Sequence, residues 1–287
     1  MHKLQDTELI LTSENKIYHL NLSKNEIADD IILVGDPDRV AVISSKFDSI
    51  EHKIQNREFV THTGTLNGKR ISAIATGIGP DNIDIVINEL DALVNIDFKT
   101  RTINQQKKKL NMIRLGTSGA LQQDIKVDTF FAASYGLGID GLAHFYQNQE
   151  VLEQEMATSY SNHANWPSKL SAPYFIKASI CLLNQFSDIP SGITATAPGF
   201  YGPQGRTLRL SPSIKDLHEK MESFNYKGEK ISNFEMETSA LYYLGQTLGH
   251  NTLTICAVIA NRLSKQYSTD YKKTVEKMID LVLNRIC

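Results

Sequence analysis

Two arginines stand close to glycine-rich turns, and each is placed where it could bind an anion. Arg39 follows the apolar residues 31–34 and a turn that begins at Gly35. These features are typical of a strand covered on both faces and followed by an anion-binding loop. Because open α/β sheets bind ligands at the carboxyl ends of their strands, we expect Arg39 to hold a phosphate. The alternative is a surface ion pair between Asp36 and Arg39, which would contribute little.

Arg114 lies inside a second apolar run, in the sequence Met-Ile-Arg-Leu-Gly-Thr-Ser-Gly of residues 112–119. A buried guanidinium without an anion is unfavourable, which favours a ligand at this position. We expect the run to end in a Gly-Thr-Ser-Gly turn, whose backbone amides and the hydroxyls of Thr117 and Ser118 could donate to the same oxyanion. An internal salt bridge from Arg114 to a carboxylate is the alternative.

Residues 200–206, Phe-Tyr-Gly-Pro-Gln-Gly-Arg, combine an aromatic ring with polar side chains in a loop. Phe200 offers a stacking surface, while Gln204 and Arg206 offer a set of donors and an acceptor. This trio would suit a planar heterocycle that carries carbonyl groups. A surface turn with incidental polar residues is the alternative.

The segment Asn-Phe-Glu-Met-Glu-Thr begins at Asn233 and is expected to open a helix that ends at Gly249. Glu235 and Glu237 are two positions apart, so only one of them can easily face a given ligand. A carboxylate that accepts hydrogen bonds from two neighbouring hydroxyls suits a ribose. Met236, which stands between the two glutamates, suits the apolar face of a sugar. A favourable interaction with the helix dipole explains either carboxylate equally well.

Alternating strand-like and helix-like segments predict an α/β layered fold in a single domain of residues 1–287. Asn67-Gly68 joins two strand-like runs at residues 58–66 and 70–76, which is a strong hairpin signal. Apolar residues at helical spacing predict a helix from Asp81. Further strands are expected over residues 128–134, 192–197 and 252–260, and further helices over residues 172–186, 237–248 and 270–286.

The composition excludes several classes of partner. A net charge of −2 gives no electrostatic case for nucleic acid or a membrane surface. The lysine-rich residues 99–109 have no interleaved aromatic residues and are expected to form an exposed loop. The turn Gly77-Ile78-Gly79 has Asn82 where a dinucleotide fingerprint needs its third glycine, so no NAD or FAD is expected.

The spacing of the cysteines and the lengths of the apolar segments indicate the cellular compartment of the protein. Cys181, Cys256 and Cys287 are widely spaced and lack a metal-ligand pattern. The chain shows no signal-like or membrane-spanning apolar run. We therefore expect a cytoplasmic protein with reduced thiols and without a bound metal.

Six motifs occur in the order found in uridine phosphorylases of the nucleoside phosphorylase superfamily, which the chain resembles from Tyr18 to Arg262. They are GDPDR at residues 35–39, REF at 57–59, TGIG at 76–79, RLGTSG at 114–119, FYGPQGR at 200–206 and FEMET at 234–238. The resemblance implies a three-layer α/β fold with a mixed, barrel-like central sheet flanked by helices. It also implies a homo-oligomer, a dimer or a hexamer, whose active sites are shared between two chains.

The resemblance assigns roles to individual residues. It implies phosphate binding by Gly35, Arg39, Arg114 and Thr117, with Arg57 reaching the phosphate of a neighbouring subunit. Ribose binding is implied for Met236 and Glu237, with His19 reaching across to the 5′-hydroxyl. Base binding is implied for Phe200, Gln204 and Arg206. The residues expected to act in catalysis are Arg39, Arg114, Arg206 and Glu237.

The implied reaction is phosphorolysis of uridine, with deoxyuridine or thymidine as other substrates, to uracil and ribose 1-phosphate. Phosphate is a co-substrate and no cofactor is expected, although a monovalent cation near Glu58, Ile78 and Asn82 stays open. In the purine branch a late strand ends in Ser-Asp, whereas here Asn261 takes the place of the aspartate and cannot protonate a leaving base. Alternatives are a purine nucleoside phosphorylase, a nucleosidase of the same superfamily and a catalytically silent nucleoside-binding protein.

Overall fold

Strand β1 (Asp30–Val34) lies between two parallel neighbours, β4 (Lys69–Ala75) and β7 (Asn111–Ala120). The computed structural model describes residues 3–286 of the chain. Residues 31–34 are all buried in it, as a continuous apolar run predicts for a strand covered on both faces. The carboxyl ends of β1 and β4 therefore bring Gly35 and Gly77 to the same edge of the sheet.

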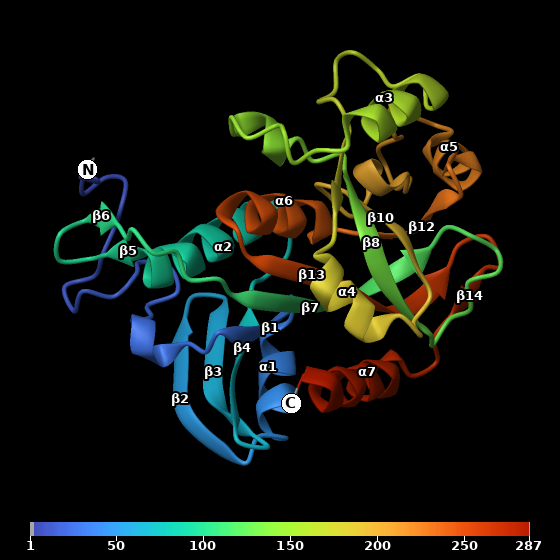
Figure 1. The fold of residues 1–287 in the computed structure, drawn as a ribbon. Helices are drawn as coiled ribbons and strands as arrows, with labels where there is room; N and C mark the ends of the chain where they lie inside the picture. Colours follow the sequence, from blue (N-terminus) through green and yellow to red (C-terminus); the bar gives the residue numbers. More distant parts are fainter. Residues whose placement is uncertain (1–2, 287) are drawn as a thin grey trace.

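An antiparallel meander forms one end of the sheet (Figure 1). Strands β2 (Ser49–Asn56) and β3 (Phe59–Leu66) pair with each other, and β3 pairs with β4. Asn67 and Gly68 connect β3 to β4 with φ values of 52° and 77°. Positive φ at both positions is what a type I′ hairpin turn requires, so the predicted hairpin is confirmed.

Five strands close into a barrel at the other end of the same twelve-stranded sheet. The order β12 (Glu229–Glu235), β10 (Ser191–Thr196), β8 (Phe130–Gly138), β13 (Asn251–Asn261) and β7 is completed by an antiparallel pairing of β12 with β7. The expected barrel-like mixed sheet is confirmed. The remaining strands are short: β5 (Ile96–Asp97), β6 (Thr102–Ile103), β9 (Tyr174–Lys177), β11 (Asn225–Tyr226) and β14 (Gln266–Tyr267).

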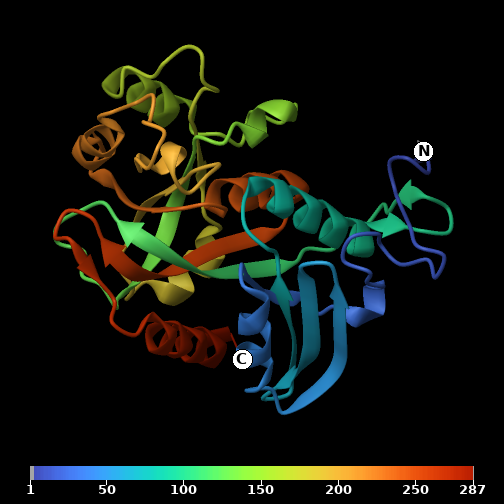
Figure 2. The same cartoon turned by 180° about the vertical axis from the view of Figure 1, so that it is seen from behind.

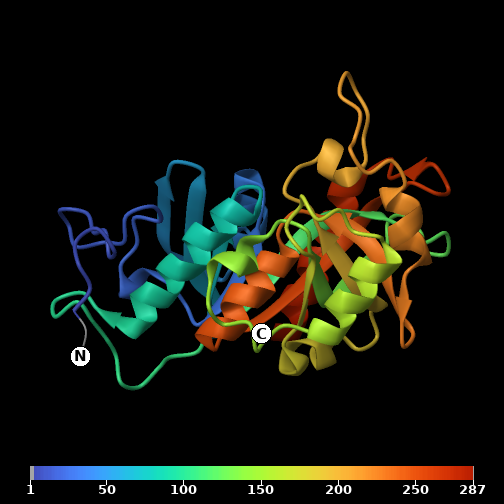
Figure 3. The same cartoon turned by 90° about the horizontal axis from the view of Figure 1, so that it is seen from above.

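Helices cover both faces of the sheet and complete the three layers. On one side α2 (Pro80–Asn95) lies beside α6 (Thr238–Leu248), as Figure 3 shows from above. On the other side α1 (Pro37–Ser44) and α7 (Tyr271–Ile286) lie next to each other in Figures 1 and 2, joined by an ion pair of Lys46 with Asp280 at 2.6 Å. The shorter α-helices are α3 (Gln154–His163), α4 (Ile180–Leu183) and α5 (Leu217–Ser223). Single 3₁₀ turns are η1 (Lys24–Glu26), η2 (Leu142–Phe145), η3 (Asn184–Phe186) and η4 (Gly202–Gln204).

Three expected elements are wrong in kind. Residues 116–119 continue β7 instead of turning, because they pair with β13 along their whole length. Residues 233–235 end strand β12, and the helix expected from Asn233 begins only at Thr238. The helix expected over residues 172–186 is instead β9, α4 and η3, since a short buried apolar run does not distinguish a strand from a helix.

The exposed loop expected at residues 99–109 is confirmed in outline, because most of these residues are solvent-exposed around the small β5–β6 pair. The helices expected from Asp81 and over residues 237–248 and 270–286 are present to within a few residues. Within residues 3–286, no helix is both long and apolar enough to cross a membrane.

Candidate functional site

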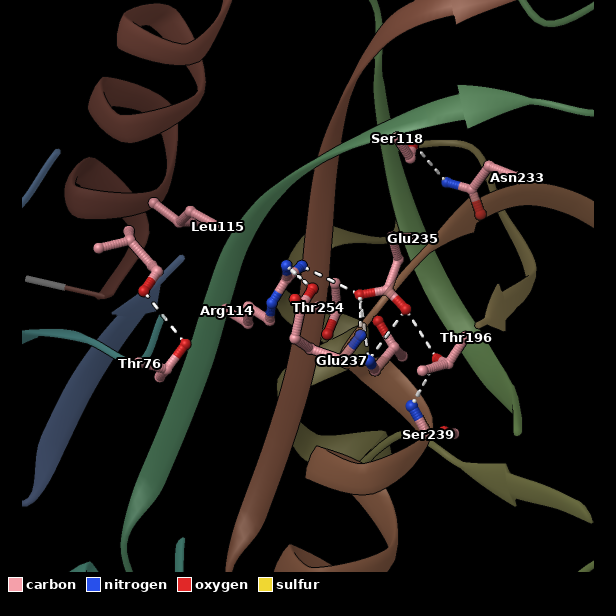
Figure 4. A network of polar contacts seen from close by, with 12 residues as sticks. Thr76, Arg114, Leu115, Ser118, Thr196, Asn233, Glu235, Glu237, Ser239 and Thr254 are labelled. Carbon is pink, nitrogen blue, oxygen red and sulfur yellow. Dashed lines mark hydrogen bonds and ion pairs between the residues drawn. The ribbon is translucent and has the colours of Figure 1, made fainter. Parts of the chain in front are cut away.

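Arg114 lies inside the sheet, where its guanidinium meets two carboxylates (Figure 4). The residue is 4% exposed, forms an ion pair with Glu237 through Nη2, and its Nη1 is 3.2 Å from Glu235 Oε2. Its Nε and Nη1 are buried and make no hydrogen bond within the described residues. The internal salt bridge considered as the alternative therefore exists, and N–H groups on two buried nitrogens are left without a hydrogen bond for a further acceptor.

The charges of this cluster shift one another's pKa values. Burial alone would lower the pKa of Arg114, but Glu237 and Glu235 raise it well above its ordinary value. Burial also raises the pKa of the Glu237 carboxyl to about 7, against the opposing effect of Arg114. Two buried acids thus share one buried cation, and any added anion would compete with them for it.

Glu237 is positioned by its backbone neighbours as well as by Arg114. Its Oε1 accepts a hydrogen bond from the backbone N–H of Gly79 at 2.8 Å, and the side chain is 3% exposed. Gly79 precedes α2 and has a φ of 101°, which glycine adopts without strain. The turn at residues 77–79 therefore contacts the candidate ribose carboxylate.

Glu235 connects the end of β12 to the start of α6. It accepts from the Thr196 hydroxyl at 2.7 Å, from the N–H of Glu237 at 2.9 Å and from the N–H of Thr238 at 3.0 Å. Its carboxylate satisfies donors at a helix start, so the structural explanation that sequence left open for either glutamate applies to Glu235. Glu237 accepts from none of these donors; its oxygens contact the Gly79 N–H and Arg114 instead.

Arg39 lies in the first turn of α1 and points back to the sheet. Its Nη1 donates to the carbonyl of Leu115 at 3.1 Å, while Asp36 caps the helix by accepting from the N–H of Asp38 at 3.0 Å. The Asp36–Arg39 surface pair considered from sequence is therefore wrong. Burial lowers the pKa of Arg39, and the nearby charge of Arg114 lowers it further. An anion between the two guanidiniums would relieve that repulsion.

Glycines border the same region. A Cβ at Gly35 would lie 3.4 Å from the carbonyl oxygen of Gly77, and a Cβ at Gly116 would lie 2.1 Å from Arg114 Nη1. Gly116 therefore leaves the room that the Arg114 side chain needs. Thr117 follows it on β7 and is half-buried, whereas Ser118 is buried and accepts a hydrogen bond from Asn233 Nδ2 at 2.8 Å.

Arg57 and His19 lie in a separate cluster at the β2–β3 turn. Arg57 is exposed, has a φ of 53°, and its guanidinium is 5.6 Å from the centre of the Tyr18 ring. His19 Nδ1 is 2.7 Å from Glu89 Oε1, and its backbone N–H donates to the same carboxylate at 3.0 Å. Within the described chain, neither Arg57 nor His19 contacts Arg114 or Glu237. Their reach into a neighbouring subunit stays a prediction.

The loop at residues 200–206 brings the three candidate base-binding side chains together. The Arg206 guanidinium lies 3.6 Å from the centre of the Phe200 ring, and its Nη1 donates to Gln204 Oε1 at 2.6 Å. Gln204 is 4% exposed, whereas Phe200 is 50% exposed. The loop thus offers a buried amide beside a half-exposed aromatic ring, over which the Arg206 guanidinium lies.

Arg262 is a member of this group that the sequence analysis missed. It follows β13, and its Nη1 donates to the backbone carbonyl of Gln204 at 2.6 Å. Burial and the charge of Arg206 together lower its pKa to about 10. An arginine directly after a buried strand was the available signal, the same one that singled out Arg39.

Asn261, which precedes Arg262 in the chain, has a structural role. The residue is 1% exposed, and its Nδ2 donates to the carbonyls of Gln122 at 2.9 Å and Ile125 at 2.7 Å. Its Oδ1 accepts from the N–H groups of Leu263 and Ser264, both at 3.0 Å. Every polar atom of the Asn261 side chain is therefore already engaged.

The residues considered for a monovalent cation gather around Gly77. A Cβ at Gly77 would meet both Asn82 Nδ2 and Glu58 Cγ, and Asn82 Nδ2 lies 3.5 Å from the carbonyl of Ile78. The amide thus turns its nitrogen, not its oxygen, to the expected ligand carbonyl. This arrangement does not fit a cation held by one chain. Among residues 3–286, no group of three His, Cys, Asp or Glu side chains could hold a metal.

Residues 29–286 match the family described as the phosphorylase superfamily, and the chain therefore belongs to that superfamily. A uridine phosphorylase of Thermococcus kodakarensis is 29% identical to it over 270 residues, which cover 93% of this chain and 85% of the relative. A DeoD-type purine nucleoside phosphorylase of Bacillus velezensis is 27% identical over 279 residues, covering 93% and 98%.

The fold agrees with that membership. A nucleoside phosphorylase of Trypanosoma brucei, described as showing uridine phosphorylase activity, superposes with a TM-score of 0.84 and 28% sequence identity. The superposition covers 94% of this chain and 98% of that structure. The fold is therefore shared over nearly the whole length of both chains.

Proposed function

We propose that the protein is a uridine phosphorylase, which cleaves uridine with inorganic phosphate to give uracil and ribose 1-phosphate. The observation that carries the proposal is the buried pairing of Arg114 with Glu237, beside the Arg39 guanidinium. Phosphorolysis needs a cation for phosphate and a carboxylate for ribose in direct proximity, because the two substrates react with each other.

Phosphate is the nucleophile in this proposal. Arg39 and Arg114 would bind its oxygens together with the backbone of Gly35 and the hydroxyl of Thr117, and Arg57 of a second subunit would complete the site. Two neighbouring guanidiniums favour an anion at this position over the neutral water of a hydrolase. This preference sets phosphorolysis apart from the nucleosidase alternative.

The ribose would lie between phosphate and base. Glu237 would accept hydrogen bonds from the sugar hydroxyls, Met236 would contact the apolar face of the ring, and His19 of a second subunit would reach the 5′-hydroxyl. Cleavage of the glycosidic bond develops positive charge on the sugar, as in other oxocarbenium-like reactions. Bound phosphate stabilises that charge without a covalent enzyme intermediate.

The base leaves with developing negative charge. Arg206 and Gln204 would hydrogen-bond to the uracil carbonyl and imide groups, with Phe200 against the ring and Arg262 supporting Gln204 from behind. Such preorganised donors stabilise an anionic leaving group, and loss of one of them costs on the order of 3 kcal/mol of barrier. Asn261, whose amide is fully engaged, supplies no proton.

The choice of base is the point on which relatives differ, since the curated relatives include both uridine and purine nucleoside phosphorylases. We favour a pyrimidine because Gln204 and Arg206 lie together in the base loop. The proposed setting is pyrimidine nucleoside salvage in the cytoplasm, by a homo-oligomer, a dimer or a hexamer, with shared active sites.

Turnover of uridine, deoxyuridine, thymidine and inosine at saturating phosphate, followed by chromatography, tests the choice of base. We expect the highest kcat/KM with uridine and release of uracil. Faster turnover of inosine would place the protein with the purine nucleoside phosphorylases instead. Binding of uridine without turnover would favour the catalytically silent binding protein.

A further inference from the structure

The carboxylate of Glu237 has two partners, and one of them is the guanidinium that we assign to phosphate (Figure 4). Its Oε2 forms an ion pair with Arg114 Nη2, while its Oε1 accepts a hydrogen bond from the backbone N–H of Gly79 at 2.8 Å. Glu237 is 3% exposed and Arg114 is 4% exposed, so water screens their charges little. The chain therefore neutralises its own phosphate-binding guanidinium with its own ribose-binding carboxylate.

An oxyanion at Arg114 would meet Glu237 at one shared nitrogen. The Nε of Arg114 is buried and makes no hydrogen bond within the described residues. An anion that accepts two parallel N–H bonds on this side of the guanidinium uses Nε and Nη2, and Nη2 is the nitrogen that Glu237 contacts. The remaining nitrogen, Nη1, lies 3.2 Å from Oε2 of Glu235. Phosphate would thus add a negative charge beside the Glu237 carboxylate in a buried site, where like charges repel strongly.

Glu237 is the more weakly held of the two acids at Arg114. Three donors besides Arg114 hold the carboxylate of Glu235, namely the Thr196 hydroxyl and two backbone N–H groups at the start of α6. Among the described residues, the N–H of Gly79 is the one further donor to the Glu237 carboxylate. Separation of Glu237 from Arg114 therefore breaks fewer contacts than separation of Glu235 would, and it frees Oε2.

We propose that Glu237 competes with phosphate for Arg114, and that this competition couples the binding of the two substrates. Phosphate takes the place of Oε2 at Arg114, and Oε2 becomes an acceptor for the ribose hydroxyls while Oε1 keeps the N–H of Gly79. The nucleoside, in turn, holds Glu237 away from Arg114 and so tightens phosphate binding. Because the two binding free energies are linked, each substrate raises the affinity for the other by the same factor. The inference rests on the proposed function, since it extends the phosphate and ribose roles of these two residues.

Isothermal titration calorimetry of inorganic phosphate into the full-length protein, without nucleoside, measures the competition. The titration is made at about pH 8, above the pKa of about 7 of the Glu237 carboxyl, so that the carboxylate is charged. Glu237→Gln keeps the size of the side chain but removes its charge. Glu229→Gln is the matched control, because it makes the same change at the start of β12, outside the Arg114 cluster.

We expect phosphate to bind Glu237→Gln about 10-fold more tightly than the wild type, because a like charge is removed from the anion site. Glu229→Gln should bind phosphate within about 2-fold of the wild type, since solvent screens a distant charge. Initial rates of the wild type over a grid of uridine and phosphate concentrations measure the coupling. Saturating uridine should lower the apparent dissociation constant of phosphate about 10-fold.

Phosphate binding that is equal or weaker in a folded Glu237→Gln would overturn the inference, because the ion pair would then orient Arg114 for phosphate instead of competing with it. If thermal unfolding shows that Glu237→Gln does not fold, the wild-type grid decides alone. Absence of uridine turnover and of phosphate binding in the wild type would overturn the proposed function and this inference with it. Normal turnover with a phosphate affinity that does not change with uridine would overturn this inference only.

Discussion

Arg114 is the residue on which the account depends, because it is a cation buried between two acids. Removal of one partner from a buried ion pair leaves an uncompensated charge and destabilises the fold. Arg114 variants therefore mix effects on stability with effects on phosphate binding. Arg39 is half-buried and has no carboxylate partner among the described ion pairs, so it separates the two effects.

Replacement of Arg39 by alanine should raise KM for phosphate about 100-fold, because it removes one charged donor from the anion site. KM for uridine and the thermal stability should change little. Arg285→Ala is the matched control. Arg285 lies on α7, outside the site, and pairs with Asp188 at 2.5 Å. Steady-state kinetics at varied phosphate measure the effect, and an unchanged KM in Arg39→Ala would contradict the assignment.

Glu237 should make the stability of the protein depend on pH. Burial raises its pKa to about 7, above the ordinary value of 4.5 that it regains on unfolding. A raised carboxyl pKa means that the folded state binds the proton more tightly. The stability contributed by that proton is present below about pH 4.5 and is lost as the pH rises through about 7.

Glu237→Gln removes this titration, so its stability relative to the wild type should increase from about pH 4.5 to about pH 7. The expected change is about 3 kcal/mol, as 1.4 kcal/mol per pKa unit implies. Urea unfolding at several pH values measures it. A stability difference that stays constant with pH would show that the Glu237 carboxyl has the same pKa in the folded and unfolded protein.

At the scale of elements, the site is built where β12 ends and α6 begins. Glu235 holds this junction through Thr196 and through two backbone N–H groups, and the same residue contacts Arg114 (Figure 4). The next two residues of the chain are the proposed ribose contacts. The local structure at one strand end therefore sets the distance between the phosphate and ribose sites.

Glu235→Ala should lower the free energy of unfolding by about 3 kcal/mol, since it leaves Arg114 with one carboxylate and the start of α6 without its acceptor. Glu229→Gln, at the half-buried start of the same strand, should change it by less than about 0.5 kcal/mol. Urea unfolding followed by circular dichroism compares the two. Similar losses in both variants would mean that Glu235 has no special structural role.

Sequence patterns located the elements whose signals are local. The apolar residues of β1, the Asn67-Gly68 turn and the helical spacing of α2 and α7 each depend on neighbours in the chain. The pairing of β12 with β7 depends on Asn233 meeting Ala120 and on Phe234 meeting Gly119. Because such contacts join segments far apart in the sequence, no local pattern indicates the strand, and the local pattern predicts a helix for residues 233–235 instead.

The candidate site likewise contains residues with local sequence signals and contacts that only the fold determines. Arg39, Arg114, Gln204, Arg206 and Glu237 were predictable because each stands beside a strand end, a glycine or another polar residue of its own motif. The partners they adopt, such as Gly79 for Glu237, depend on three-dimensional packing and could not be predicted locally. Arg262 and His218 contact Gln204 from segments far along the chain, and no short motif pairs them with it.

At the scale of the whole molecule, the proposal of a shared site depends on Arg57 and His19. Arg57 is exposed in the β2–β3 turn, His19 of the N-terminal segment lies beside that turn, and neither contacts Arg114 or Glu237 of the same chain. If the protein is a symmetric oligomer, each such turn can serve the site of its neighbour. One pair of variants, Arg57→Ala and Arg39→Ala, then tests both the oligomeric state and whether two chains contribute to one site.

Arg57→Ala and Arg39→Ala should each have little activity at low phosphate, but a refolded equal mixture should regain part of it. In a symmetric dimer, half of the mixed dimers' sites are intact, so the mixture should reach about a quarter of the wild-type rate. Light scattering gives the oligomeric state of the same samples. Activity equal to the mean of the two separate variants would show that Arg57 acts within its own chain.

The phosphate dependence of uridine cleavage tests the central claim most directly. The measurement follows uracil release by the full-length protein with and without inorganic phosphate, and identifies the sugar product by chromatography. We predict uracil and ribose 1-phosphate in equal amounts when phosphate is present, and no uracil when it is absent. Free ribose released without phosphate, or no cleavage under either condition, would contradict the account.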